Sequence, residues 1–373
     1  MQNLLSFSSV MSSVWSVVLA VLVLLVMVTV HEFGHYVAGK ALHFGITEFS
    51  IGFGPAIFKK KRKNGELFAL RLIPLGGYCA FLGESGEEED LKNDPSAFNN
   101  RKPWQRIVVL LSGAAMNFLT ALLCIVISFV AFGQILLGVY KAEPLQPYEI
   151  AEYGGYSFMD GDIILSVNGR DCYLSTDVMK VVGGGKKGDV FTFEILRNRE
   201  KITQKIKLRT DADVGSVTEI NTVYQSLGVA KDADGNYEMR SYLWKLGFFE
   251  AIAKAFVYAF RIAGTIFTIL GQLFTGRLGL SAFGGPITTI SVTSKIVSLG
   301  FLQFLEIVSY IGVNLAVFNL LPIPALDGSK VVFTVIEWIR KKPVNRKVEN
   351  AIHVVGLFLL FGFAILVDIL QFV

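Results

Sequence analysis

Two histidines and a glutamate lie together in the segment His31-Glu32-Phe33-Gly34-His35. On a helix, residues four apart share a face, so His31 and His35 can present two imidazoles to one metal ion. Glu32 lies on the adjoining edge, where it can take a proton from a metal-bound water without being a ligand. Two buried histidines bonded to neighbouring helices are the alternative. Ionisable residues inside an apolar segment are costly and usually functional, so the pattern favours a hydrolytic metal site.

A catalytic zinc ion typically has three protein ligands and leaves a fourth position for water. His43 lies beyond the apolar segment, and His353 is possible but isolated at the start of the last one. We expect the third ligand to be Asp327, which follows Pro322 and Pro324. Each proline interrupts a helix, so the chain can turn back and point Asp327 inward. Taken alone, Asp327 would be a polar residue at a helix end.

Two asparagines precede this aspartate in the same apolar stretch, Asn314 and Asn319. Hydrogen bonding between helices explains such residues without any catalysis. Asn319 could instead hold a substrate carbonyl or the oxyanion that forms from it. Both interpretations stay open from the residues alone.

The composition is typical of a membrane protein. Of the 373 residues, 52% are hydrophobic and 18% are charged. The net charge of +4 is small and scattered, which argues against a nucleic-acid partner. Cys79, Cys124 and Cys172 show no CxxC spacing, so we expect three unpaired thiols.

We expect four transmembrane helices, because four segments have about the 20 apolar residues that a bilayer requires. They fall in residues 1–42, 104–139, 301–328 and 351–373. The loops at 43–103 and 329–350 are rich in Lys and Arg, so the positive-inside rule places both in the cytoplasm and the N-terminus outside. This topology brings the two ends of the metal motif to the same face.

The remaining segments do not cross the bilayer in this interpretation. Residues 43–103 contain two strand-like runs joined at Asn64-Gly65, which predicts a β-hairpin. Residues 140–245 are polar and long enough for one small external domain. Residues 246–300 predict amphipathic helices at the membrane surface, because three charges interrupt the apolar run: Glu250, Lys254 and Arg261. A fifth span there would carry Asp327 to the opposite side.

Together these residues resemble the site-2 protease family (M50), and in particular its bacterial RseP-type intramembrane zinc metalloproteases. The resemblance covers nearly the whole chain. It is carried by the HEFGH segment, by the element N-x-x-P-x-P-x-L-D-G at residues 319–328, and by the segments 49–55, 72–78 and 285–287.

The resemblance implies a polytopic α-helical membrane protein with a membrane-associated β-hairpin and one inserted extracytoplasmic PDZ-like α+β domain. It implies one zinc ion per chain on His31, His35 and Asp327, with Glu32 activating a zinc-bound water. It also implies a free sheet edge that captures an unwound substrate as an added strand. The residues expected to contact substrate are Asn319, Asn314, Gly76 and Gly77.

The implied function is hydrolysis within transmembrane segments of single-span proteins in the bacterial cell membrane. In relatives such substrates include anti-sigma factors and remnant signal peptides, first cut by a site-1 protease or signal peptidase. The alternative is an inactive membrane scaffold or a metal transporter that retains the site. The intact Glu32 argues against a relic, and only Glu306 and Asp368 could extend an intramembrane path for a transported ion.

Overall fold

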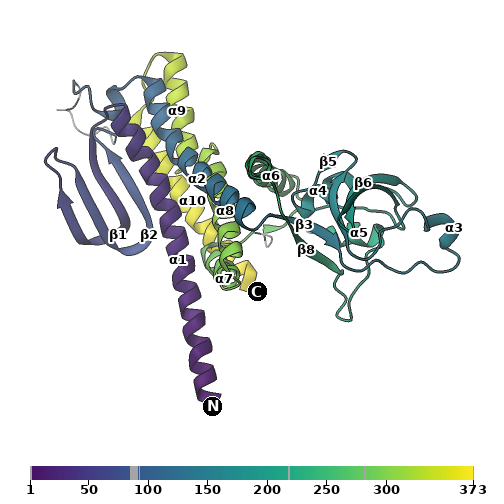
Figure 1. Ribbon diagram of the computed structural model, residues 1–373. Helices are drawn as coiled ribbons and strands as arrows, with labels where there is room; N and C mark the ends of the chain where they lie inside the picture. Colours follow the sequence, from purple (N-terminus) through teal and green to yellow (C-terminus); the bar gives the residue numbers. More distant parts are fainter. Residues whose placement is uncertain (1, 85–90, 92, 217–218, 281–282, 373) are drawn as a thin grey trace. The chain divides into compact units, whose positions relative to one another are not determined.

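The computed structural model describes residues 2–84, 91, 93–216, 219–280 and 283–372 (Figure 1). The chain divides into two compact units. The first unit comprises Met1–Ile125 and Leu280–Val373, and the second comprises Val126–Gly279. Each unit is described by itself.

The first unit consists of long helices and one β-hairpin. The helices are α1 (Gln2–Ala41), most of α2 (Pro103–Ala131), α7 (Pro286–Val297), α8 (Phe301–Leu320), α9 (Asp327–Arg340), α10 (Arg346–Phe372) and the short 3-10 helix η2 (Phe98–Asn100). The hairpin strands are β1 (Ile46–Lys61) and β2 (Leu67–Phe81).

Close contacts fix the directions of the long helices in this unit. A Cβ built on Gly34 of α1 would lie 2.4 Å from the Ser112 carbonyl oxygen of α2. Built on Gly312 of α8, it would lie 2.8 Å from Met27 Cε of α1. Small residues therefore let these helices approach closely. Because Asn319 and Asn117 both lie beside His31, α1 and α8 run in one direction and α2 runs in the other.

The β-hairpin lies beside the C-terminal half of α1 (Figure 1). Residues 48–51 are partnered twice, by residues 77–80 and by residues 67–70. Both strands bend to achieve this, and Gly52 and Gly76 adopt positive φ values of 84° and 106° that only glycine takes readily. Residues 77–80 pair on one side with residues 48–51, which leaves their other edge to face α1. The hairpin predicted around Asn64-Gly65 is confirmed, because β1 and β2 flank these residues and pair with each other.

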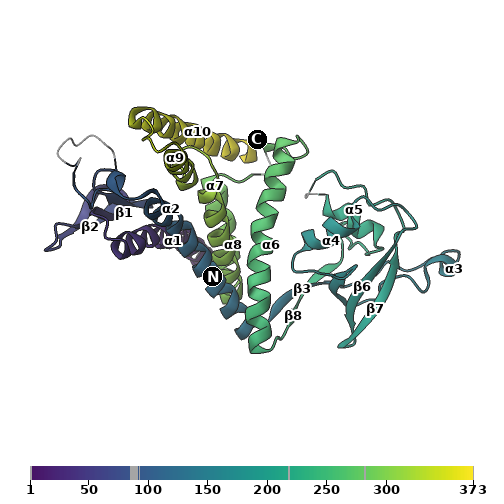
Figure 2. The same cartoon turned by 90° about the horizontal axis from the view of Figure 1, so that it is seen from above.

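The second unit is an α+β domain followed by a long helix (Figure 2). Its strands are β3 (Gln134–Val139), β4 (Asp162–Val167), β5 (Arg170–Asp171), β6 (Val190–Arg197), β7 (Glu200–Lys207) and β8 (Met239–Trp244). Its helices are α3 (Ile150–Tyr153), α4 (Ser175–Val182), α5 (Ile220–Ser226) and α6 (Phe248–Phe274). The sheet order is β7-β6-β4-β3-β8, with β5 paired to β4, and α4 and α5 bury apolar side chains against the sheet.

Two of the three charges that interrupt the apolar sequence of α6 contact this domain. Arg261 lies 3.2 Å from the buried carboxylate of Asp177, which also accepts hydrogen bonds from the backbone N–H groups of Tyr173 and Leu174 at the start of α4. The Lys254 ammonium lies over the Tyr173 ring, 5.9 Å from its centroid. These charges therefore fasten α6 to its own domain.

Among the described residues, five helices are long and apolar enough to cross a membrane: Val14–Ala41, Pro103–Ala131, Phe248–Phe274, Phe301–Leu320 and Arg346–Gln371. The chain is thus a multi-pass membrane protein that also contains β-sheets. The expected count of four differs from this set by α6, for which we predicted a position at the membrane surface.

Two predicted boundaries are wrong. The second long helix ends at Ala131 instead of residue 139, because Gly133 adopts a φ of 104° and Gln134–Val139 pairs as a strand. The third long helix ends at Leu320, just ahead of the two prolines that were expected to interrupt it. The expected loop at 329–350 is mostly helical, since α9 ends at Arg340 and α10 begins at Arg346.

Candidate metal centre

Helix α1 places the two histidines of HEFGH on one face. The ring centroids of His31 and His35 are 4.7 Å apart at an interplanar angle of 84°, and both residues are 6% exposed. Their Nε2 atoms lie 3.1 Å apart. This is the arrangement that the four-residue spacing predicted.

The chain turns back after α8 and brings Asp327 to these histidines. Pro322 and Pro324 fall in the turn between α8 and α9, and Ala325 takes a left-handed φ of 75°. Gly328 is needed here, since a Cβ on it would lie 2.3 Å from the Leu321 carbonyl oxygen. Asp327 then opens α9. The proline break that the sequence predicted is confirmed.

The carboxylate of Asp327 completes a triangle of ligand atoms. Its Oδ2 lies 2.9 Å from His31 Nε2 and 3.2 Å from His35 Nε2. These are the only described His, Cys, Asp and Glu side chains that gather in a group able to hold a metal ion.

The triangle fits a zinc ion. A tetrahedral zinc with bonds of about 2.0–2.1 Å separates its ligand atoms by about 3.3 Å. The observed edges of 2.9, 3.1 and 3.2 Å are close to that value and slightly shorter. Two imidazole nitrogens and one carboxylate oxygen are also donors that zinc accepts in catalytic sites.

The second nitrogen of each imidazole has a polar neighbour. His35 Nδ1 lies 2.7 Å from the Val109 carbonyl oxygen, which fixes the proton on Nδ1 and frees Nε2 for a metal. His31 Nδ1 lies 3.5 Å from the Asn117 amide and 3.3 Å from the Asn319 amide. Asn117 is fully buried and its Oδ1 has no partner among the described residues. Either amide can turn its oxygen toward a protonated His31 Nδ1, as a metal on Nε2 would require.

Glycine at position 113 makes room for the imidazoles. A Cβ there would lie 2.4 Å from His35 Nε2 and 2.8 Å from His31 Cε1. Neither Gly113 nor Asn117 was among the residues predicted to form the site. The available signal was their place in the pattern of the resembled family, which has a glycine ahead of an asparagine in the second helix.

Glu32 points toward the hairpin. Its Oε2 accepts a hydrogen bond of 3.0 Å from the backbone N–H of Cys79, on the edge of β2 that pairs with no other strand in the described part of the chain. Gly77 lies against the same side chain, because a Cβ built on it would be 3.7 Å from Glu32 Cγ. Gly76 instead packs against the Phe53 ring.

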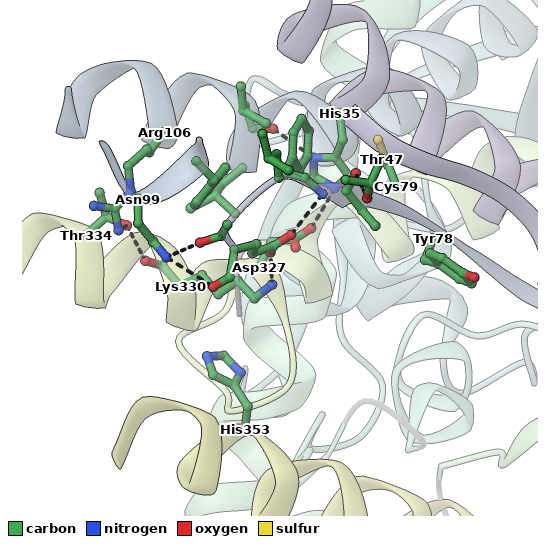
Figure 3. A pocket seen from close by; sticks show the side chains of 18 of the residues that line it. His35, Thr47, Tyr78, Cys79, Asn99, Arg106, Asp327, Lys330, Thr334 and His353 are labelled. Carbon is green, nitrogen blue, oxygen red and sulfur yellow. Dashed lines mark hydrogen bonds and ion pairs between the residues drawn. The ribbon is translucent and has the colours of Figure 1, made fainter. Parts of the chain in front are cut away.

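A cavity of about 620 Å³ opens beside the triangle (Figure 3). Its lining includes Glu32, His35, Cys79, Asp327, Lys330 and His353. A second cavity of about 260 Å³ touches His31, Asn117 and Asn319. Asn314 is not among the described residues that line these two cavities. It lies five residues before Asn319 on the same helix, so its side chain points from a different face.

His353 supports the turn and is not part of the triangle (Figure 3). Its Nδ1 accepts a hydrogen bond of 3.1 Å from the N–H of Ala325. Gly356, one turn further along α10, allows Pro324 to pack directly against that helix. Helix α10 therefore holds the turn that carries Asp327. His43 ends the turn after α1 with a φ of 59° and takes no part in the group either.

Ion pairs hold the part of α9 that follows Asp327. Glu337 lies 2.6 Å from Arg106 of α2 and 2.7 Å from Arg346 of α10. Burial opposes its ionisation, but the Val344 N–H and these guanidinium groups lower the pKa of Glu337. Lys330 lies 2.6 Å from Glu84, whose charge raises the pKa of the Lys330 ammonium.

Comparison with known proteins places this site in a family. The model of Peptidase family M50 matches residues 19–363. A Brucella suis biovar 1 protein is 29% identical over 381 residues, covering 96% of this chain and 95% of its own length. A Clostridium perfringens protein is 29% identical and covers 95% of this chain and 97% of its own. A Nostoc protein is 29% identical, with 94% of each chain covered. All three are named as candidate zinc metalloproteases.

The match spans both parts of the metal motif, and the donor set suits the zinc ion that the family uses. The chain belongs to Peptidase family M50 and is a zinc metalloprotease of membranes.

Proposed function

We propose that the chain hydrolyses peptide bonds within or beside the transmembrane segments of single-span membrane proteins. The observation that carries the proposal is the triangle of His31, His35 and Asp327 beside a cavity that Glu32 also lines. In this proposal the three side chains hold one zinc ion, and Glu32 is the catalytic carboxylate.

Zinc bound there would act as a Lewis acid and lower the pKa of water. Glu32 takes a proton from the attacking water and passes it to the leaving amine. Val109 and the asparagine amides keep the imidazoles oriented through their Nδ1 atoms. Asn319 is also close enough to the second cavity to donate to a substrate carbonyl.

The edge of β2 at Gly77 and Cys79 is the proposed docking line for substrate. A helical peptide bond is shielded, so the substrate must be unwound, and an open strand edge offers it new hydrogen-bond partners. The Cys79 N–H on this edge already reaches Glu32, so a strand paired there would lie next to the catalytic carboxylate. Gly76 supports this edge by packing on Phe53, whereas Asn314 lines neither cavity and is not a substrate contact in this proposal.

Helix directions in the first unit support four crossings, with the active site near the cytoplasmic side. Helices α1 and α8 run toward the metal triangle, and α2 and α10 run away from it. Asp368 near the far end of α10 reaches the start of α7, so the chain returns to this unit at the end where α2 leaves it. These directions favour an even number of crossings between α2 and α7, and α6 is therefore proposed to be a surface helix. The helix ends beside the metal triangle are flanked by basic residues, so the positive-inside rule places this side in the cytoplasm.

The external domain is proposed to be PDZ-like and to act as a size filter. Strand β3 is paired along its whole length by β8, from Gln134 opposite Trp244 to Val139 opposite Met239. That edge has no room for an added peptide strand while β8 is in place. A filter of this kind admits substrates whose external part has been trimmed by a site-1 protease or signal peptidase. Anti-sigma factors and remnant signal peptides in a bacterial cell membrane are such substrates.

Asp368 does not extend an ion path, which disfavours a metal transporter. Its carboxylate accepts hydrogen bonds from the N–H groups of Ile287 (3.0 Å) and Thr288 (3.1 Å) and from Thr288 Oγ1 (2.9 Å). It therefore caps the N-terminus of α7, a structural use of an intramembrane charge.

The proposal is tested with purified protein in proteoliposomes that contain a model single-span substrate. Glu32→Gln should keep its zinc and lose cleavage by at least about a thousandfold, since both proton transfers are removed. Asp327→Asn should lose both zinc and cleavage. His43→Gln, a histidine outside the triangle, is the matched control and should keep both. Cleavage by Glu32→Gln, or full zinc in Asp327→Asn, would refute the assigned roles.

A further inference from the structure

The tip of the β-hairpin carries an unusual concentration of positive charge. Residues 59–63 are five consecutive basic residues, and all are exposed. Arg62 contacts Tyr36, Glu66 and the Phe68 ring. Lys59, Lys60, Lys61 and Lys63 form no ion pair with any residue that the structure describes. Four ammonium groups therefore remain available to an external anion.

The same hairpin exposes large apolar side chains next to these lysines. Ile57 is 66% exposed, Leu72 is 60% exposed and Phe58 is 57% exposed. Phe53, Leu70 and Ile73 are exposed as well. Exposed apolar residues grouped in this way mark a contact with a protein or a membrane.

Contacts with α1 set the level of each part. The turn lies at the end of the spanning helix, where Glu66 forms an ion pair with Lys40 and Arg62 reaches the Tyr36 hydroxyl. The end of the hairpin opposite the turn lies nearer the middle of α1, where Gly77 touches Glu32. Eight residues separate Lys40 from Glu32, which corresponds to about 12 Å along the helix axis. The lysines are therefore level with the end of α1, and the bend at Phe53 is deeper.

We propose that residues 59–63 bind the headgroups of anionic phospholipids while the apolar side chains of residues 53–73 enter the same leaflet. The charges match because a row of ammonium groups at the bilayer surface attracts anionic lipid. The depth matches because the contacts with α1 place the bend at Phe53 further toward the middle of that helix than the lysines. Bound lipid would hold the hairpin, and hence the edge at Cys79, at a fixed depth beside Glu32. This last consequence rests on the proposed function, whereas the lipid site does not.

The test uses the full-length protein in bilayers of phosphatidylcholine with a minority of phosphatidylglycerol. Spin-labelled forms of each lipid report their relative association constants for the protein. Replacing four lysines (K59Q, K60Q, K61Q and K63Q) spares the packed Arg62. We expect this variant to lower the preference for phosphatidylglycerol by at least about fivefold, because each basic residue at a bilayer surface contributes an attraction of that order. Raised salt should weaken the wild-type preference.

The matched control makes the same change of charge in the other unit, at exposed lysines (K180Q, K187Q, K201Q and K205Q), and should keep the preference. Hydrogen exchange locates the effect: the peptide covering residues 53–73 should exchange more slowly with phosphatidylglycerol present, in wild type only. Glu32→Gln should bind lipid as wild type does, so an inactive enzyme would not obscure the result. If the quadruple variant does not insert, the pairs K59Q/K60Q and K61Q/K63Q carry the same expectation. Two results would show that the basic run directs topology only. One is an unchanged preference for phosphatidylglycerol in the quadruple variant. The other is equal hydrogen exchange of the wild-type peptide in bilayers with and without phosphatidylglycerol.

Discussion

Gly113 of α2 lies so close to His35 that a Cβ at that position would be 2.4 Å from the imidazole Nε2. The atom it would strike is the one that faces Asp327 and His31. A single hydrogen in place of a side chain is therefore a condition for assembling the three donors.

Gly113→Ala should weaken zinc binding by at least about tenfold, as loss of support around a metal ligand does. Alanine favours a helix by up to about 1 kcal/mol over glycine, so the helix itself should tolerate the change. The measurement is zinc retention against a chelator. Gly362→Ala, in α10 with nothing within 4 Å of the new Cβ, is the control. Equal zinc affinity in the two variants would contradict the steric argument.

Asn117→Ala should lower zinc affinity by about 10–100-fold, because His31 loses a buried amide that can fix its tautomer. Asn314→Ala removes the same group from a half-buried site outside both cavities and should leave zinc and cleavage unchanged. Chelator competition and substrate cleavage measure both. A loss of cleavage in Asn314→Ala with zinc retained would restore the substrate role first expected for that residue. A loss of zinc in this variant would contradict the special role of Asn117.

His353→Ala should loosen the turn that carries Asp327, since the Ala325 N–H loses its acceptor. Left-handed alanine costs about 1 kcal/mol that glycine avoids. Adding Ala325→Gly to His353→Ala should therefore recover part of the lost zinc affinity. A general loss of folding would not be rescued in this way, and an additive loss in the double variant would rule out the proposed support.

Acid should remove the contribution of Glu337 to stability. Its folded pKa is lowered, so its ionised form stabilises the protein above the unfolded value near 4.5, and this stabilisation is lost as the pH falls through the folded value. Glu337→Gln should be less stable than wild type at neutral pH by about 3 kcal/mol, because Arg106 stays buried without its partner. The difference should narrow below about pH 4. Thermal unfolding across this range measures it, with the exposed Glu200→Gln as control; a gap that stays constant with pH would contradict the assignment.

The sequence was most informative where chemistry and local geometry coincide. The four-residue spacing of HEFGH predicts the face shared by the histidines, and two prolines predict the turn ahead of Asp327. Both are confirmed. That the carboxylate meets the imidazoles required helices far apart in the chain to pack together, which topology suggested and spacing alone does not encode.

The misses have physical causes. Helix α9 was missed because its Lys and Arg residues suggested a loop, although its apolar residues recur at helical spacing. Strand β3 continues the apolar run of α2, and periodicity cannot distinguish the two over so few residues. Support from Gly113 and Asn117 depends on tertiary contacts between helices, where a glycine or a buried amide in an apolar run has several possible roles.

The separation of the three proposed ligands along the chain also sets the earliest moment at which the metal site can form. Asp327 follows His31 by 296 positions. At about 5–20 residues per second, a ribosome needs on the order of 15–60 s to make that interval. Helix α10, whose His353 and Gly356 hold the turn, must follow before the donors are secured. On the proposed ligand set, the first helix enters the bilayer before Asp327 has been made, and therefore before the three donors can meet.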